Sequence, residues 1–271
     1  MHGKKVMVVT LCALLLFGAL AFASVSLGQQ KALADEATFY STSSDGFLEI
    51  ANSSYTAAHD AANADVIWSA LTWSAIGQAF ISGNYQIYRN ALFFDTSSLP
   101  DSAVVTAATL SLYGSVDYST TDFDITVVDG SLLNDPLVLG DYGDLLTQTI
   151  SGGAFNTSGF SVSGYNDIPL NPTGMGWISK TGMTKFGLRS SREIASIVPR
   201  GYEAININQY EEGVGYQPRL VVSYDTAAPT PTIPPPPSPV PTLSQWGMIG
   251  MAIVLSVALV WSIRRRLVVR T

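Results

Sequence analysis

Apolar and polar residues alternate over short stretches in the middle of the chain. Five of these stretches are rich in β-branched or aromatic residues: 85–95 (YQIYRNALFFD), 104–113 (VVTAATLSLY), 123–128 (FDITVV), 185–189 (KFGLR) and 219–224 (RLVVSY). Alternation places successive side chains on opposite faces of a β-strand. Segments rich in Gly, Asn, Ser and Pro separate the stretches and are typical of turns. Because no long window repeats apolar residues at helical spacing, we expect residues 35–225 to form one all-β domain, an antiparallel β-sandwich of the jelly-roll type.

The same spacing predicts part of the core. Leu92 and Phe94 lie two residues apart, as do Leu110 and Leu112. Residues two apart on a strand point to the same face. We expect the two pairs to meet inside the sandwich.

Other positions in the domain are interpreted as surface. Arg89 and Asp95 stand near opposite ends of one predicted strand, and each is expected to pair with an opposite charge at the sandwich edge. The Ala-rich residues 56–66 are compatible with a short helix or a surface loop, and we favour the loop. His59, next to Asp60, is expected to be exposed.

The first apolar stretch has the features of a secretory signal peptide. Lys4 and Lys5 precede an apolar run over residues 6–27, and small residues follow. A basic start, an apolar centre and a small-residue exit define such a peptide. We assign it to residues 1–34, with cleavage after Ala34 or, as the alternative, after Ala23. A retained membrane anchor is the competing interpretation.

The C-terminal part has three sections. Residues 226–239 are rich in Pro and Thr, which is typical of a semi-rigid polyproline spacer. Residues 247–263 carry no charge and are long enough, at the short limit, for one transmembrane helix. Three arginines follow at once, before a short tail at 267–271. Since basic residues remain on the cytoplasmic side, the domain is expected on the outer side of the membrane.

The end of the chain resembles the IPTL-CTERM sorting signal of Gram-negative bacteria, which we assign to residues 240–266. Its motif residues are Val240, Pro241, Thr242, Leu243, Ser244, Gln245, Trp246 and Gly247, and its basic stop is Arg264, Arg265 and Arg266. The resemblance implies Sec export, an inner-membrane intermediate, cleavage near the motif by an exosortase-type membrane transpeptidase, and release to the outer cell surface or the exterior. Val240 replaces the Ile of the family motif. An ordinary tail anchor on a proline stalk is the alternative.

The domain itself is similar to DNRLRE-type domains of secreted bacterial proteins. The similarity rests on residues 89–100 (RNALFFDTSSLP), 103–113 (AVVTAATLSLY), 177–182 (WISKTG), 185–189 (KFGLR) and 218–224 (PRLVVSY). The resemblance implies a jelly roll, and some family members are described as carbohydrate-binding modules for alginate-like polyuronates. Residues 35–79 have no such resemblance.

Charge and composition exclude several functions. Residues 35–225 hold all 21 acidic residues and seven of the 14 basic ones, a net charge of about −14, which disfavours a nucleic-acid partner. The only cysteine, Cys12, lies in the signal peptide, so the domain has neither a disulfide nor a thiol nucleophile. With His59 as its single histidine, a zinc site or a Ser-His-Asp triad is improbable.

Two candidate sites remain. Calcium takes oxygen ligands from loops, and the clustered acids Asp117, Asp122 and Asp124 are the calcium candidates, with solvated loop carboxylates as the alternative. Saccharide binding would use aromatic rings, of which Trp68, Trp73, Tyr85, Tyr88, Tyr118 and Trp177 are available, although most tryptophans are expected in the core. An anionic saccharide would also need cations, and the candidate patch beside Trp177 is Lys180, Lys185, Arg189, Arg192 and Arg200.

Three functional hypotheses follow. The first is an exported, non-enzymatic structural or adhesive protein of the cell surface or extracellular matrix. The second is a carbohydrate-binding module for an anionic polysaccharide. The third is a polysaccharide hydrolase or lyase, because a pair of carboxylates is enough for glycoside hydrolysis.

Overall fold

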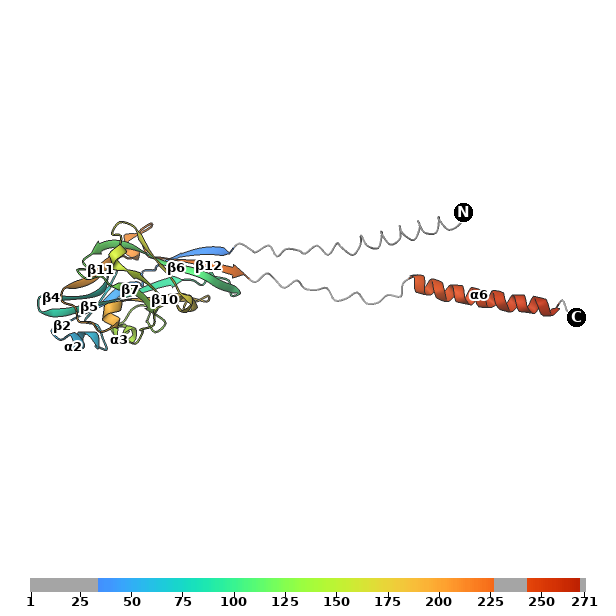
Figure 1. Ribbon diagram of the computed structural model, residues 1–271, viewed down its shortest axis with the longest axis horizontal. Coiled ribbons are helices and arrows are strands. Elements are labelled where there is room, and N and C mark those ends of the chain that lie inside the picture. The colour runs from blue at the N-terminus through green and yellow to red at the C-terminus, as the bar shows by residue number, and fades with distance from the viewer. Residues whose placement is uncertain (1–33, 227–242, 269–271) are drawn as a thin grey trace, which may run out of the picture. The chain divides into compact units, whose positions relative to one another are not determined.

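The computed structural model describes residues 34–226 and 243–268 (Figure 1). The predicted signal peptide, apart from Ala34, and most of the proline-rich linker lie outside these residues, as do Val240, Pro241 and Thr242 of the sorting motif. The chain divides into two units, one up to Ala227 and one from Ala228 onward.

The first unit is an antiparallel β structure with short helices. Its strands are β1 Asp35–Tyr40, β2 Gly46–Asn52, β3 Val66–Ser69, β4 Trp73–Ile81, β5 Asn84–Asp95, β6 Ala103–Asp117, β7 Asp124–Asp129, β8 Gly153–Asn156, β9 Tyr165–Pro169, β10 Met183–Ser190, β11 Tyr202–Asn208 and β12 Arg219–Thr226. Its helices are α2 Tyr55–His59, α3 Asp141–Leu146, α4 Pro172–Gly176 and α5 Ser191–Ile194, with 3₁₀ turns η1 Thr157–Gly159 and η2 Tyr210–Glu212. All five predicted strands are confirmed.

The strands form one curled sheet in the order β1-β12-β6-β11-β4-β5-β10-β7-β8. β2 pairs with β3 and β5, and β9 pairs with β6. Strand β6 is 15 residues long and is shared by two parts of the sheet: its first part pairs with β12 and its last residues pair with β11. The register shifts in both ladders, and such irregularities bend a strand and increase its twist.

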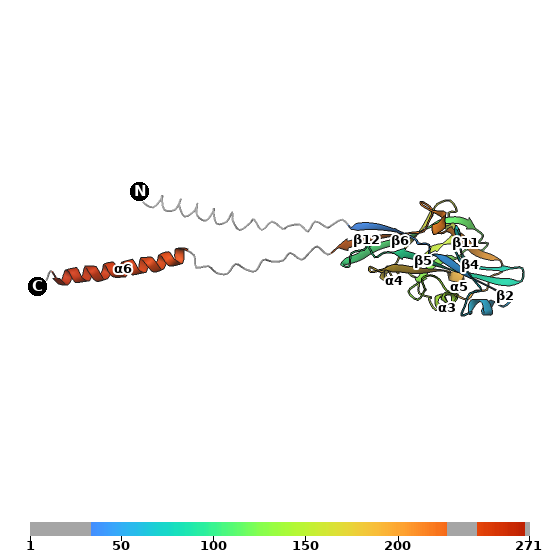
Figure 2. The ribbon, with the colours of Figure 1, turned by 180° about the vertical axis from the view of Figure 1, so that it is seen from behind.

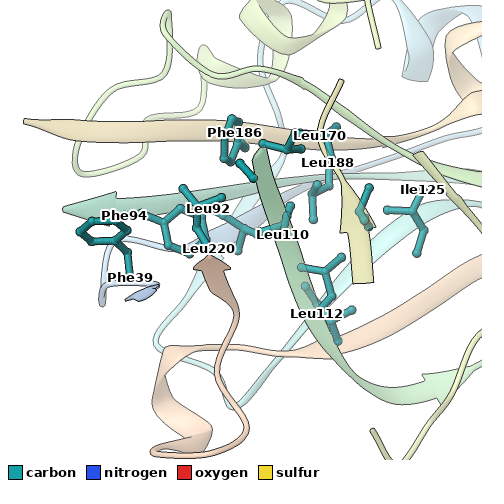
Figure 3. Close-up of a cluster of buried hydrophobic side chains, with 14 of the residues drawn as sticks. Phe39, Leu92, Phe94, Leu110, Leu112, Ile125, Leu170, Phe186, Leu188 and Leu220 are labelled. Atoms are coloured by element: carbon teal, nitrogen blue, oxygen red, sulfur yellow. The ribbon is translucent and has the colours of Figure 1, made fainter. Parts of the chain in front are cut away.

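The main core lies inside the curl of the sheet. Leu92, Phe94, Leu110 and Leu112 are fully buried in one cluster, so the predicted meeting of these two pairs is confirmed. Figure 3 shows these side chains gathered with Phe39, Phe186, Leu188 and Leu220 from other strands.

A second core lies on the opposite face of β5, beneath the short helices. Ile87, Ala91 and Phe93 point into it, alternating with the residues that face the main core. Tyr142 of α3 is fully buried there. The figures show α2 and α3 along this side of the sheet, with α5 beside α3 in the view from behind (Figures 1 and 2).

The loop expected over residues 56–66 begins as a helix instead. Ser54 caps α2 by accepting a hydrogen bond from the backbone N–H of Ala57. Tyr55 and Ala58, one turn apart, are buried against the second core. A serine cap and one apolar pair are therefore enough to form this short helix.

The described part of the second unit is helix α6, Leu243–Val268. Within it, residues Trp246–Ile263 are long and apolar enough to cross a membrane. This stretch includes the uncharged segment 247–263 that we expected to form a helix.

Candidate functional site

One face of the sheet carries a cavity of about 710 Å³. Strands β2, β3, β4, β5, β6 and β11 supply most of its lining. The lining residues are Phe47, Glu49, Trp68, Leu71, Trp73, Ala75, Ile81, Gln86, Tyr88, Ser115, Val116, Tyr118, Tyr202, Ala204 and Asn206. The volume is within the range of about 300–1,000 Å³ that is usual for ligand pockets.

The register of the strands explains why these side chains meet. Gln86 and Tyr88 lie two apart on β5, as do Phe47 and Glu49 on β2, and Glu49 is paired directly with Tyr88. Residues two apart share a face of the sheet, and directly paired residues share it too. Alternate residues of neighbouring strands thus point to the same side of the sheet and together line the cavity.

Aromatic rings form both the floor and the walls. Phe47 is almost fully buried, and its ring centroid lies 6.3 Å from Trp68, 5.6 Å from Trp73 and 6.1 Å from Tyr88. The two tryptophans remain 38% and 40% exposed. Large apolar rings left open to water in a hollow mark a binding surface.

At the other end of the cavity, Tyr118 and Tyr202 pack with ring centroids 5.8 Å apart. Both stay more than 40% exposed. Ring–ring contacts hold these side chains in place without covering their outer faces. The open faces are available to a ligand.

Polar groups at the cavity are fixed by the protein. Glu49 Oε2 accepts a hydrogen bond from Trp68 Nε1 at 2.6 Å. Burial, and next the Glu49 carboxylate, raise the pKa of Tyr88. Its hydroxyl therefore stays protonated, and it donates to Gln86 Oε1 at 2.5 Å. Most tryptophans were expected in the core, but Trp68 and Trp73 are exposed, since they lie on the cavity face of β3 and β4.

Four of the five cations in the predicted basic patch are bonded within the chain. Lys180 Nζ donates to the carbonyls of Asp101 and Ala103, and Lys185 Nζ to that of Leu133. Arg192 Nε donates to Glu203 at 2.9 Å.

The other members of that patch differ in exposure. Arg189 is buried, whereas Arg200 is exposed. Trp177 is half-buried and packs against the main core. None of these six residues lines the aromatic cavity. Their binding of an anionic saccharide stays a prediction.

The interior contains a charged cluster that sequence reasoning did not find. Glu193 on α5 pairs with Arg89 at 2.5 Å and with Arg189 at 2.7 Å, and all three side chains are buried. Arg89 was expected at the sandwich edge, but it shares the face of β5 that carries Ile87 and Ala91, which lies under the helices. The only feature of the sequence that indicates the burial of Arg89 is its position between Ile87 and Ala91 on one apolar face of the strand.

Both guanidinium groups also tie the helices to the sheet. Arg89 donates to the carbonyls of His59 and Tyr142, and Arg189 donates to that of Leu145. Every charge is thereby balanced or hydrogen-bonded, which buried ionic groups require. The cluster is closed to solvent and acts as structure.

His59 belongs to the same layer and is buried, so the expectation of an exposed residue was wrong. Its Nε2 lies 3.0 Å from the Glu193 carbonyl oxygen, and its Nδ1 lies 2.5 Å from Asp60 Oδ1. The formation of α2 explains the burial, because His59 ends that helix against α5.

The acids proposed for calcium accept hydrogen bonds in their own loops. Asp117 accepts from Ser119, Asp122 from Thr157 and Asp124 from Asn156. In residues 34–226 and 243–268, no three His, Cys, Asp or Glu side chains are grouped so that they could hold a metal ion. The structure does not bring these three carboxylates together as a site.

No family model matches the sequence, and no curated protein is similar enough to be a relative. The two family resemblances therefore stay predictions. The aromatic cavity is the feature on which a functional proposal can stand.

Replacing Glu193 with Gln leaves two buried guanidiniums with no counter-charge. We expect the free energy of unfolding at pH 7 to fall by about 3–5 kcal/mol, measured by urea denaturation. Glu212→Gln, at an exposed glutamate in η2, is the control and should change little.

The same cluster predicts an acid dependence. Burial alone would raise the pKa of Glu193, but Arg89 and Arg189 outweigh it and hold the pKa below its usual range. A lowered folded-state pKa stabilises the protein above the unfolded-state value of about 4.3, and this contribution is lost as pH falls through the folded-state value. In Glu193→Gln the free energy of unfolding should therefore decline less below about pH 5 than in the wild type. If the two proteins had equal stabilities and equal pH profiles, Glu193 would not be the counter-charge of the two arginines.

Proposed function

We propose that this chain is an exported, non-enzymatic surface protein whose β domain binds a saccharide in the aromatic cavity. The observation that carries the proposal is the cavity of about 710 Å³, walled by open tryptophan and tyrosine rings on one sheet face. This proposed site differs from the basic patch that we predicted for an anionic polysaccharide.

The chemistry of the lining suits a sugar. A pyranose ring presents C–H groups on its faces and hydroxyls at its edge. The C–H faces stack on the electron-rich faces of aromatic rings, which Trp68, Trp73 and Tyr202 offer. Hydroxyls need hydrogen-bonding partners, and Glu49 and Asn206 lie in the same lining. A purely apolar ligand would offer these polar groups no hydrogen bond.

The charges favour an uncharged saccharide over a polyuronate. Glu49 is the one charged residue among those that line the cavity, and its carboxylate would repel an anionic sugar. Lys180, Lys185 and Arg192, the cations of the predicted patch that lie partly exposed, already donate to groups of the chain itself. We therefore propose a hydroxyl-rich, neutral glycan as the ligand.

The lining also favours binding without turnover. Glycoside hydrolysis uses two carboxylates about 5–10 Å apart. Among the lining residues Glu49 is the only acid, and it is already held by Trp68. The cavity thus offers one carboxylate where hydrolysis uses two.

The place of action is part of the proposal. Helix α6 suits a membrane crossing by its length and composition, and three arginines follow its apolar span. We propose Sec export through the signal peptide, then processing at the IPTL-CTERM-like tail by an exosortase-type transpeptidase. The curled antiparallel sheet supports a jelly roll of the DNRLRE type, which is likewise proposed.

Removal of the cavity tryptophans tests the binding site. Trp68→Ala and Trp73→Ala should each weaken glycan binding roughly tenfold or more, because central aromatic anchors carry most binding energy. Binding is measured by calorimetry on the full chain in detergent micelles, using glycans identified on an array of neutral and uronic oligosaccharides. Phe80→Ala, at an exposed ring of β4 outside the cavity, is the matched control and should bind normally.

Two results would contradict the binding proposal. One is the absence of any array ligand. The other is binding that survives both tryptophan substitutions but is lost in Lys180→Ala and Lys185→Ala, which would move the site to the predicted basic patch.

The sorting proposal makes a separate prediction. In cells that encode an exosortase-like protein, the mature chain should lack its first 23 or 34 residues and the residues beyond about 240. Intact-mass measurement of the surface-extracted protein checks this. A mature mass that includes Arg264–Arg266 would show a retained tail anchor.

A further inference from the structure

Buried polar atoms without a partner gather at one place in the domain. Within the described residues, six buried side-chain atoms lack a hydrogen-bond partner. Four of them belong to three residues: Asp45 Oδ1, Gln209 Oε1 and Nε2, and Glu211 Oε2. Buried polar groups are almost always paired with protein, ordered water or an ion, so this concentration points to a ligand.

The backbone amide of Tyr210 links Asp45 to the turn that carries Gln209 and Glu211. Asp45 is fully buried at the end of the β1–β2 loop, and its Oδ2 accepts from Ser41 Oγ at 2.9 Å. The same Oδ2 accepts from the backbone N–H of Tyr210 at 3.1 Å. Tyr210 stands between Gln209, also fully buried, and Glu211. The loop before β2 and the turn η2 are therefore in contact here.

The site brings together two acidic side chains, those of Asp45 and Glu211. Glu211 lies close enough to Asp45 for the two carboxyl groups to interact electrostatically. None of the ion pairs in residues 34–226 involves Asp45 or Glu211. A fully buried carboxyl group beside a second, half-buried one is a place where a bound cation would be stabilised.

We propose that a calcium ion binds between Asp45, Gln209 and Glu211. The unpartnered atoms include two carboxylate oxygens and one amide oxygen, which are the ligands that calcium prefers. Calcium takes about 6–8 oxygen ligands and keeps waters among them, and a bound water would accept from Gln209 Nε2. The two carboxylates match the charge of the ion.

The ion would hold two segments that border the aromatic cavity. Asp45 precedes Gly46 and Phe47, the first residues of β2. On the other side, Gln209 follows Asn208, which is paired with Trp73. An ion at this point joins the two segments and keeps the cavity floor in place.

The test uses the full chain in detergent micelles, stripped with EDTA and titrated with calcium chloride. The wild type should bind calcium in calorimetry, and its melting temperature should rise by about 5–10 °C at 100 times Kd. Asp45→Asn and Glu211→Gln should each lose the rise. Asp45→Asn should melt no lower than the stripped wild type, since the amide oxygen of Asn can accept the same hydrogen bonds from Ser41 and Tyr210 and the side chain carries no charge.

Asp122→Asn and Asp124→Asn are the matched controls from the acidic loop, and both should keep the calcium response. The proposal is overturned if the wild type shows neither heat of binding nor a melting shift with calcium. It is also overturned if the response survives in Asp45→Asn and Glu211→Gln, or is lost in the loop controls. Glycan affinity is measured separately, so failure here leaves the binding proposal standing.

Discussion

Glu193 pairs with two buried guanidinium groups, and the layer of short helices depends on this interaction. Arg89 and Arg189 project from β5 and β10 into the buried interior, where an unpaired charge would cost several kcal/mol. The same guanidiniums donate to carbonyls of α2 and α3, helices of five and six residues that have no stability of their own. One carboxylate thus fastens the second core to the sheet.

Strand β5 contributes residues both to the two cores and to the cavity. Along its C-terminal half both faces are buried, with Leu92 toward the main core and Phe93 toward the helices. In its N-terminal half the helix-facing residue is Arg89, and the residue before it, Tyr88, lines the cavity. Because the helices cover only one face, the other stays open for aromatic side chains.

The strands and the main core were predictable because alternation records them directly, as at Leu92 and Phe94. The charged cluster in the interior was not predictable in this way, since an arginine in an alternating strand is usually interpreted as an edge residue. The only indication was that Arg89 shares one face of the strand with Ile87 and Ala91. The cavity was predictable only in part. The rings of Trp68, Trp73, Tyr88 and Tyr118 were identified as candidates, but they come together through the pairing of strands that are far apart in the sequence. The contact of Asp45 with the η2 turn has no local sequence signal at all.

The most direct test of the account follows the indole N–H signals of the domain by NMR during titration with a glycan found on the array. Binding in the cavity predicts shifts of the Trp68 and Trp73 signals, with Trp177 unchanged. Shifts confined to Trp177, which belongs with Lys180 to the predicted basic patch, would contradict the proposal that the open aromatic face of the sheet is the binding surface.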